Sequence, residues 1–320
     1  MSTYLWLMTC GSVVVFALYG LYCSRDQHRE ELQRSAWKTA GLALVFSVVF
    51  GAVLARVSYA LLMQELDFEY DGIAALEQLL WFDIDSVSFM GGALGVLLGV
   101  LLANRITRKG AVIMGLDAFA PFGALLVALF RMGEMFFGSY GTGTSLPEGS
   151  ALAFFPFAIE IKVDGGYSYW GWAVFVLSAL FALAWAAVSF LGLRGKTKKG
   201  LNFTLTLFFL ALPQVLCESM RKRGMLWLFV HVEQLLCVLV LAAVLIYWIV
   251  TAKGKRSWLS RWLPFAVTLV CVGLLIATEY AIDGKLFDLS HTICYTFMSA
   301  VLVVMGASGL VAFKRWNEEQ

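Results

Sequence analysis

Long apolar runs, separated by short polar connections, follow one another along the whole chain. A helix needs about 20 apolar residues to cross a bilayer, and nine runs reach or approach that length. They cover residues 4–23, 39–63, 88–104, 111–131, 170–193, 201–219, 225–250, 262–281 and 292–313. The pattern predicts an all-α fold, a polytopic transmembrane helical bundle of about nine helices.

The amino-acid composition supports a membrane protein and argues against a soluble domain. Hydrophobic residues make up 60% of the 320 residues and charged residues 14%, whereas a soluble domain is about a quarter charged. The six cysteines show no CxxC spacing, so neither a zinc site nor a disulfide framework is indicated, and we expect no metal or other cofactor. Nothing in the charge pattern supports nucleic-acid binding. The partners we expect are the membrane and its lipids.

Basic residues gather in alternate connections between the apolar runs. By the positive-inside rule these connections face the cytoplasm, which predicts an N-terminus outside and a C-terminus inside. They contain Arg25, Arg29, Arg34 and Lys38, then Arg105, Arg108 and Lys109, then Arg194, Lys196, Lys198 and Lys199, then Lys253, Lys255, Arg256 and Arg261, and finally Lys314 and Arg315. The basic run 221–223 breaks the rule. It indicates a miscounted helix, side chains that snorkel to lipid headgroups, or an outward-facing cationic site for a phosphate.

Two predicted outer connections are long and rich in aromatic residues. Residues 64–87 carry seven acidic side chains among aromatics and leucines, which favours an interfacial helix or a lid. Residues 133–169 join a glycine- and threonine-rich stretch to an apolar one. Loops longer than about 15 residues are usually functional or disordered, and the aromatic content favours function. We expect both connections to cover a site.

An ordered set of short motifs resembles the prolipoprotein diacylglyceryl transferases, bacterial inner-membrane enzymes that move diacylglyceryl from phosphatidylglycerol to the cysteine of preprolipoproteins. The set consists of Gly51 with Ala55-Arg56 and Tyr59, Ser88-Phe89-Met90-Gly91-Gly92, Asp117 with Ala120-Pro121, Arg131-Met132-Gly133, Glu218 with Arg221, and Gln234. The resemblance spans roughly residues 50–245. It implies a transferase-like membrane core over 1–250, with the outer connections 64–87 and 133–169, and two additional helices over 251–320.

Several positions depart from the family pattern. Met90 stands where the family has a histidine, Glu134 where it has an asparagine, and Gln214 where it has a second important arginine. The resemblance therefore implies the fold, while the standard reaction needs separate support.

The family reaction implies a site that stabilises a phosphate leaving group and produces a thiolate. Arg131 and Arg221 are the candidate headgroup ligands, Glu218 orients the headgroup, and His231 is a candidate substitute base; these four form the predicted catalytic set. The predicted substrate-binding set contains Arg56, Gly91, Gly92, Gly133, Glu134, Gln214 and Gln234. No metal ligand is predicted.

Simpler structural roles compete for several of these residues. Arg131 at a helix end can snorkel to the interface, and it lies three residues before Glu134, within side-chain reach. Glu218 and Arg221 have the same spacing and can form an ion pair that stabilises the helix end.

Four further expectations concern residues inside the bundle. His231 is expected about 9 Å inside its helix, and Arg56 about 10 Å below the outer surface, where Glu134 or Glu218 can pair with the arginine. The glycines of 91–99 favour close helix packing. Asp117 is expected to make a polar contact between helices.

Three functions follow from these patterns. The first is a diverged diacylglyceryl transferase of a bacterial cytoplasmic membrane, acting on a phosphatidylglycerol-like phospholipid, with a lipobox-bearing preprolipoprotein as its possible partner. The second is a non-catalytic lipid- or lipoprotein-binding membrane protein. The third is a small polytopic transporter that uses Arg56, Asp117, Glu218 and His231 as a polar pathway, although no internal repeat supports it.

Overall fold

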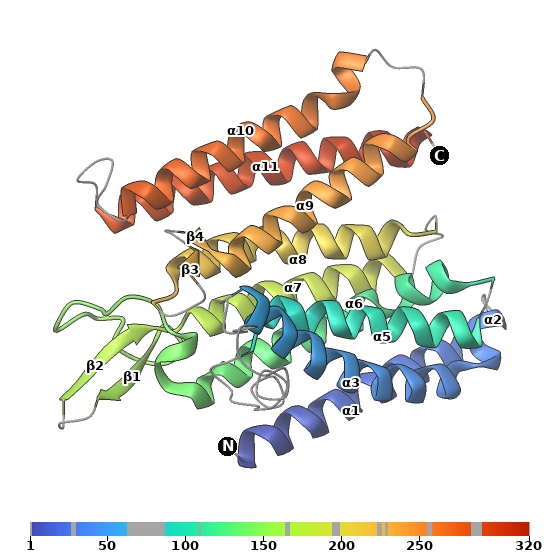
Figure 1. Cartoon of the computed structure of the whole chain (residues 1–320), viewed down its shortest axis with the longest axis horizontal. Helices are drawn as coiled ribbons and strands as arrows, with labels where there is room; N and C mark the ends of the chain where they lie inside the picture. Colours follow the sequence, from blue (N-terminus) through green and yellow to red (C-terminus); the bar gives the residue numbers. More distant parts are fainter. Residues whose placement is uncertain are drawn as a thin grey trace, which may run out of the picture. The chain divides into compact units, whose positions relative to one another are not determined.

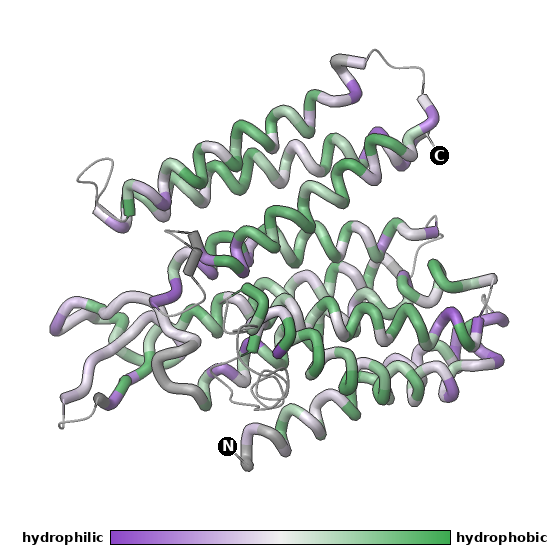
Figure 2. The backbone as a smooth tube through the Cα atoms, in the orientation of Figure 1, coloured by the Kyte–Doolittle hydropathy of each residue, from purple (hydrophilic) through white to green (hydrophobic). Residues whose placement is uncertain are grey.

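The structure, a computed structural model, confirms a multi-pass helical membrane protein. It describes residues 2–26, 30–62, 87–108, 110–163, 167–193, 199–222, 226–227, 230–254, 258–282 and 290–319. Within these ranges, nine helices are long and apolar enough to cross a membrane. Hydrophobic residues line the helices, and hydrophilic residues gather toward their ends (Figure 2). The interfacial helix or lid expected at 64–87 falls almost entirely outside the described residues.

The chain divides into two compact units, Met1–Tyr140 with Ala182–Phe203, and Gly141–Phe181 with Thr204–Gln320. Helices α7 and α8 contribute to both. The first unit also contains α1 (Ser2–Arg25), α2 (Glu30–Arg34), α3 (Ala36–Leu62), α5 (Phe89–Thr107), α6 (Val112–Gly133) and most of the 3-10 helix η2 (Glu134–Gly141), while α7 is Val174–Leu193 and α8 is Leu201–Met220.

Helices α3 and α5 lie side by side, and glycines allow their backbones to meet (Figure 1). A Cβ atom on Gly91 would lie 2.5 Å from the carbonyl oxygen of Leu54, and one on Gly99 would lie 2.5 Å from the backbone nitrogen of Ser47. A Cβ on Gly95 would overlap the carbonyl oxygen of Phe50. The close packing predicted from these glycines is confirmed.

A buried arginine joins three helices of the first unit, α1, α2 and α5, and the residue between α2 and α3. Arg108, only 4% exposed, donates to the Tyr19 hydroxyl at 3.1 Å, to Asn104 Oδ1 at 3.0 Å, to Ser35 Oγ at 2.9 Å and to the Leu32 carbonyl at 3.0 Å. The planar guanidinium suits such a divergent set of acceptors. Arg108 directly follows α5, at the start of one of the predicted basic connections, and its buried side chain anchors the fold.

Asp117 caps the N-terminus of α8 from the first turns of α6. Its carboxylate accepts from the backbone N–H of Gly200 at 2.6 Å and of Phe203 at 2.9 Å, and its carbonyl accepts from Asn202 Nδ2 at 3.1 Å. The first N–H groups of a helix have no intrahelical partner and favour negative charge. The expected polar contact between helices is confirmed, and its role is to begin α8.

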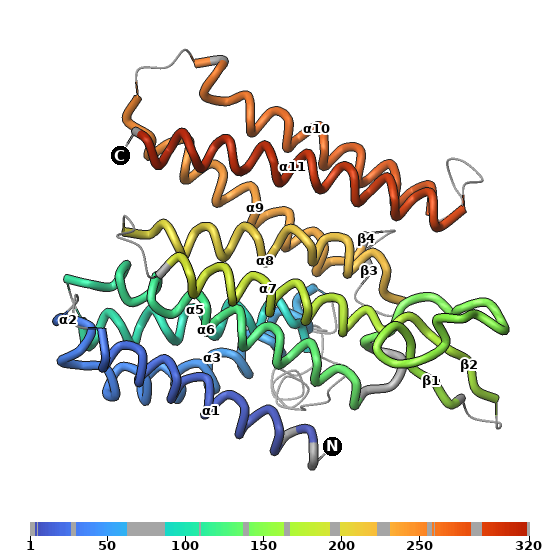
Figure 3. The backbone as a smooth tube through the Cα atoms, turned by 180° about the vertical axis from the view of Figure 1, so that it is seen from behind, coloured from blue at the N-terminus to red at the C-terminus, as the bar shows by residue number. Residues whose placement is uncertain are grey.

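The second unit adds three helices and two small antiparallel sheets. Its further elements are β1 (Ala158–Val163), β2 (Tyr167–Trp172), β3 (Leu226–Trp227), β4 (Val230–His231), α9 (Val232–Thr251), α10 (Trp258–Ile282) and α11 (His291–Glu319). In β1 and β2 the register pairs Ile161 with Tyr169, and in β3 and β4 it pairs Leu226 with His231. Helices α10 and α11 lie side by side in both views (Figures 1 and 3).

Two buried tryptophans join α9 to α11. Trp248 and Trp316 are both 0% exposed, and their ring centroids lie 6.4 Å apart. Trp316 Nε1 donates to Thr251 Oγ1 at 2.8 Å, and Trp248 Nε1 donates to Thr204 Oγ1 of α8 at 3.0 Å. The indole rings fill the core while their N–H groups keep partners.

Two predicted helix boundaries are wrong. The run 170–193 begins as strand β2, and α7 starts only at Val174. The run 225–250 begins with the β3 and β4 pairing, and α9 starts at Val232. In both runs apolar strand residues continue directly into an apolar helix, so hydropathy alone gives no boundary.

Candidate functional site

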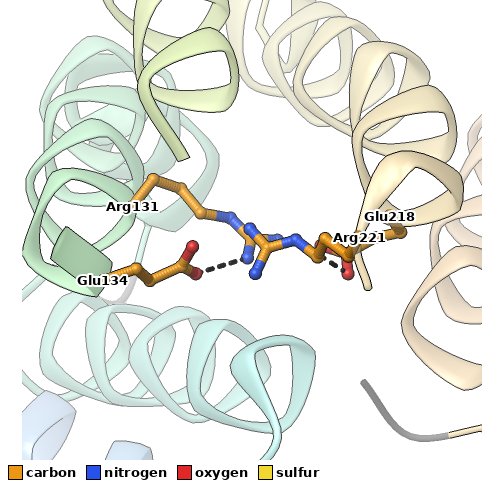
Figure 4. A network of polar contacts seen from close by, with 4 residues as sticks. All are labelled: Arg131, Glu134, Glu218 and Arg221. Carbon is orange, nitrogen blue, oxygen red and sulfur yellow. Dashed lines mark hydrogen bonds and ion pairs between the residues drawn. The ribbon is translucent and has the colours of Figure 1, made fainter. Parts of the chain in front are cut away.

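The last turn of α6 holds a buried ion pair. Arg131 Nη1 donates to Glu134 Oε1 at 2.7 Å, and the two side chains are 2% and 10% exposed (Figure 4). Glu134 is the C-cap residue of the helix, so the helix continues far enough for the i, i+3 spacing to bring the groups together. The predicted reach of Arg131 to Glu134 is confirmed.

Two aromatic residues lie next to this ion pair. The guanidinium carbon of Arg131 lies 3.6 Å from the ring centroid of Phe89, the first residue of α5, whose N-cap Ser88 accepts from Gly91 N–H at 3.0 Å. Tyr4 of α1 lies close enough to Glu134 to interact electrostatically. We call Arg131, Glu134, Phe89 and Tyr4 the Arg131 group.

Gly133 makes room for the first helix beside this group. A Cβ atom there would lie 2.7 Å from Tyr4 Cε2 and 2.8 Å from Met8 Cε. Sequence reasoning gave Gly133 a role in substrate binding, which nothing in the structure tests, and it missed Tyr4 and Phe89. Phe89 belongs to the motif Ser88-Phe89-Met90-Gly91-Gly92, which the sequence analysis had singled out. It is the first residue of α5, and its ring contacts Arg131.

Arg56 and the glycines 91 and 92 have described neighbours within the first unit. Arg56 is 6% exposed, and its guanidinium carbon lies 5.7 Å from the ring centroid of Tyr59. Pairing of Arg56 with Glu134 or Glu218 stays a prediction. Gly91 packs on α3, and a Cβ on Gly92 would meet Ala55 Cβ at 3.6 Å, so their described contacts are with a neighbouring helix.

A second buried ion pair lies at the end of α8. Arg221 Nε lies 3.3 Å from Glu218 Oε2, and both side chains are 3% exposed (Figure 4). Arg221 directly follows the helix, and its backbone forms a β-bridge with Gly143. The next residue, Lys222, donates its N–H to the Thr142 carbonyl at 3.0 Å. The connection 133–169 therefore holds the backbone at this arginine.

Gln214 lies one turn before Glu218 on the same face of α8. It is 4% exposed, and among the described residues neither its amide nitrogen nor its amide oxygen has a hydrogen-bond partner. Buried amides are nearly always paired, so this amide is available to a polar ligand. We call Gln214, Glu218 and Arg221 the Arg221 group.

His231 lies at the start of α9 and not inside it. It is the N-cap residue of α9 and the last residue of β4, so the expected depth of about 9 Å within the helix is wrong. The apolar residues before it form strands. His231 is 8% exposed, and Gln234 follows in the first turn of α9, where its Nε2 donates to Glu279 Oε1 at 2.7 Å.

The fold and these residues define a class, that of polytopic membrane proteins with buried arginine–carboxylate pairs at helix ends. Over residues 3–250 the chain matches the prolipoprotein diacylglyceryl transferase family. This match covers most of the chain, and the protein belongs to that family. No curated protein matches the chain.

Family membership supports a transferase function in lipoprotein biosynthesis at a membrane, with phospholipid and prolipoprotein as the family's substrates. The match ends within α9, so α10 and α11 lie beyond it. Both buried ion pairs fall inside the matched residues.

Proposed function

We propose that the protein transfers the diacylglyceryl group of a phosphatidylglycerol-like lipid to a cysteine thiol of a lipobox-bearing preprolipoprotein, in the outer leaflet of a bacterial cytoplasmic membrane. This location follows from the predicted topology, with the N-terminus outside. The observation that carries the proposal is the pair of buried arginines, Arg131 and Arg221, each held by a carboxylate three residues away within the family-matched residues. Buried guanidinium groups suit a phosphodiester, which accepts two parallel N–H bonds.

The reaction forms a carbon–sulfur bond and breaks a carbon–oxygen bond at the same carbon atom. The acceptor thiol loses its proton and its sulfur attacks the diacylglyceryl carbon that carries the phosphate. The carbon–oxygen bond to phosphate breaks, and glycerol phosphate leaves with the electron pair. Charge therefore grows on the phosphate oxygens, where fixed cationic donors stabilise the transition state.

We assign the roles accordingly. Arg131 and Arg221 bind the phosphate, and Glu218 holds Arg221 in place. His231 is our candidate for the base that removes the thiol proton, because Met90 cannot accept one. The unsatisfied amide of Gln214 contacts the headgroup on the Glu218 face of α8. The remaining predicted substrate residues, Arg56, Gly91, Gly92, Gly133, Glu134 and Gln234, form or support the binding surface.

A second function, lipid binding without transfer, is favoured by one specific observation. Glu134 neutralises Arg131 directly at 2.7 Å, so a phosphodiester has to share the guanidinium with a carboxylate or displace it. Such a pair suits a polyol or zwitterionic headgroup, whose donors can contact the carboxylate, better than a bare anion. A protein with this preference can retain lipid and transfer nothing.

The test uses the full chain in vesicles that contain phosphatidylglycerol and a lipobox peptide. A transferase makes the peptide heavier by one diacylglyceryl group in the mass spectrum, and Arg131→Ala abolishes the gain. Arg34→Ala is the matched control, because Arg34 also pairs with a glutamate, Glu30, but both side chains are largely exposed. Lipid that co-purifies with the protein, with no change in peptide mass, would instead establish the binding function.

A further inference from the structure

Helix α10, beyond the family-matched residues, supplies a carboxylate to a residue within them. Gln234 Nε2 donates to Glu279 Oε1 at 2.7 Å, and the two residues are 3% and 5% exposed. The family match ends at residue 250. A contact between these two residues therefore joins the α10–α11 pair to the part of the chain that carries the family's function.

This bond fixes which way the amide of Gln234 faces. In this bond the amide nitrogen lies toward Glu279, so the amide oxygen on the other branch of the planar group faces away from it. That oxygen, Oε1, is buried and has no hydrogen-bond partner among the described residues. A buried acceptor without a donor costs about 1–3 kcal/mol. Gln234 thus presents a fixed, unsatisfied acceptor to which a hydroxyl group of a ligand can donate.

Helix α11 contacts the end of α8 beside the Arg221 group. The Tyr295 hydroxyl of α11 donates to the Ser219 carbonyl at 3.5 Å, and Ser219 Oγ donates to Met298 Sδ at 3.5 Å. Tyr295 also lies near enough to Glu279 to interact with it electrostatically. Ser219 directly follows Glu218 in the sequence, so α11 contacts the residue next to one that is proposed to bind the headgroup.

We propose that Glu279 is a positioning residue that holds Gln234 Oε1 as the acceptor for a headgroup hydroxyl, so that the α10–α11 pair is part of the substrate site. This rests on the proposed function only in that the chain must bind a phospholipid. A neutral amide oxygen accepts from a neutral hydroxyl without bringing a further charge into the membrane. The substrate class that fits is a lipid with a polyol headgroup.

The experiment compares two anionic lipids that differ in this hydroxyl. The full chain is placed in nanodiscs with equal amounts of phosphatidylglycerol and phosphatidylmethanol, and native mass spectrometry measures which lipid it retains. We expect the protein to prefer phosphatidylglycerol about tenfold, the value of one good hydrogen bond. Glu279→Leu should reduce that preference to less than about twofold.

Two further variants separate positioning from damage to the fold. Thr278→Val is the matched control, because Thr278 neighbours Glu279 and, among the described residues, its hydroxyl donates back to the Leu274 carbonyl within α10. This variant should keep the full preference. Gln234→Leu should match Glu279→Leu, and the double variant should lose nothing more, because both changes remove one acceptor. If Glu279→Leu does not fold, Gln234→Leu measures the same acceptor from α9.

Other results overturn the proposal. An unchanged preference in Glu279→Leu or Gln234→Leu, additive losses in the double variant, or a preference for an ethanolamine headgroup over glycerol would each do so. Retention is measured without turnover, so the two proposals fail separately. Hydroxyl-dependent retention without transfer to the peptide refutes the transferase alone, whereas transfer with no hydroxyl preference refutes the role of Glu279 alone.

Discussion

The guanidinium carbon of Arg131 lies over the ring of Phe89, 3.6 Å from the ring centroid. Because the Phe89 ring and the Glu134 carboxylate both restrain the guanidinium group, the arginine is fixed before any ligand arrives. Preorganised donors of this kind lower the cost of binding a phosphate.

Replacing Phe89 should therefore weaken lipid binding. Phe89→Leu removes a cation–π contact of about 1 kcal/mol, so the dissociation constant for phosphatidylglycerol should rise about fivefold, measured by native mass spectrometry. Phe89→Tyr keeps the ring and should bind normally. Phe46→Leu, which removes a ring that packs on Phe50, is the control; an equal loss there would argue for a general packing effect.

Removing the charge of Glu134 should favour anionic lipid. In Glu134→Asn the Arg131 guanidinium no longer pairs with a carboxylate, so retention and turnover of phosphatidylglycerol should both rise. If competition from the carboxylate costs about 1.4 kcal/mol of lipid binding free energy, the rise is roughly tenfold. Vesicles of phosphatidylglycerol and of phosphatidylethanolamine provide the comparison. No change in binding or turnover would remove the idea that Glu134 sets the substrate preference.

Loss of the α8 cap should cost stability and leave the chemistry intact. Asp117→Ala strips the partners from the N–H groups of Gly200 and Phe203, and we expect the free energy of unfolding to fall by about 2 kcal/mol. Thermal unfolding in detergent measures it. Asp117→Asn keeps one carbonyl acceptor and should lose about half as much. Unchanged stability in both variants would contradict the capping role.

The α3–α5 contact can be tested with two glycines. In Gly95→Ala the new methyl group meets the backbone of Phe50 and Gly51, which cannot move aside, and overpacking of this kind costs about 1–3 kcal/mol. Gly41→Ala is the matched change, since a Cβ at Gly41 has nothing within 4 Å, and it should gain up to about 1 kcal/mol from helix propensity. Equal unfolding temperatures for the two variants would be inconsistent with this packing.

The sequence predicted what depends on local spacing. Nine apolar runs indicated the helices, and the i, i+3 spacing indicated both ion pairs, because a helix alone brings such residues together. The spacing of the glycines in α5 likewise predicted close packing against a neighbouring helix. These features need no knowledge of how distant segments meet.

Other features depend on tertiary contacts and could not be predicted. The strands β3 and β4 are as apolar as the start of α9, so hydropathy could not show where the helix begins. For this reason the sequence placed His231 inside the helix instead of at its N-cap. The bond from Gln234 to Glu279 joins residues on separate helices, and no local pattern pairs them. The contact between Phe89 and Arg131 could not be predicted for the same reason, although both residues lie in motifs that the sequence analysis singled out.

The burial of Trp248 against Trp316 has a consequence for how the protein is made. The indole of Trp248 emerges from the ribosome together with α9, but its partner follows only after α10 and most of α11 have been synthesised, seconds later at about 5–20 residues per second. Until then this face of α9 lies against lipid or the insertion machinery. Packing of this face of α9 thus awaits the synthesis of Trp316.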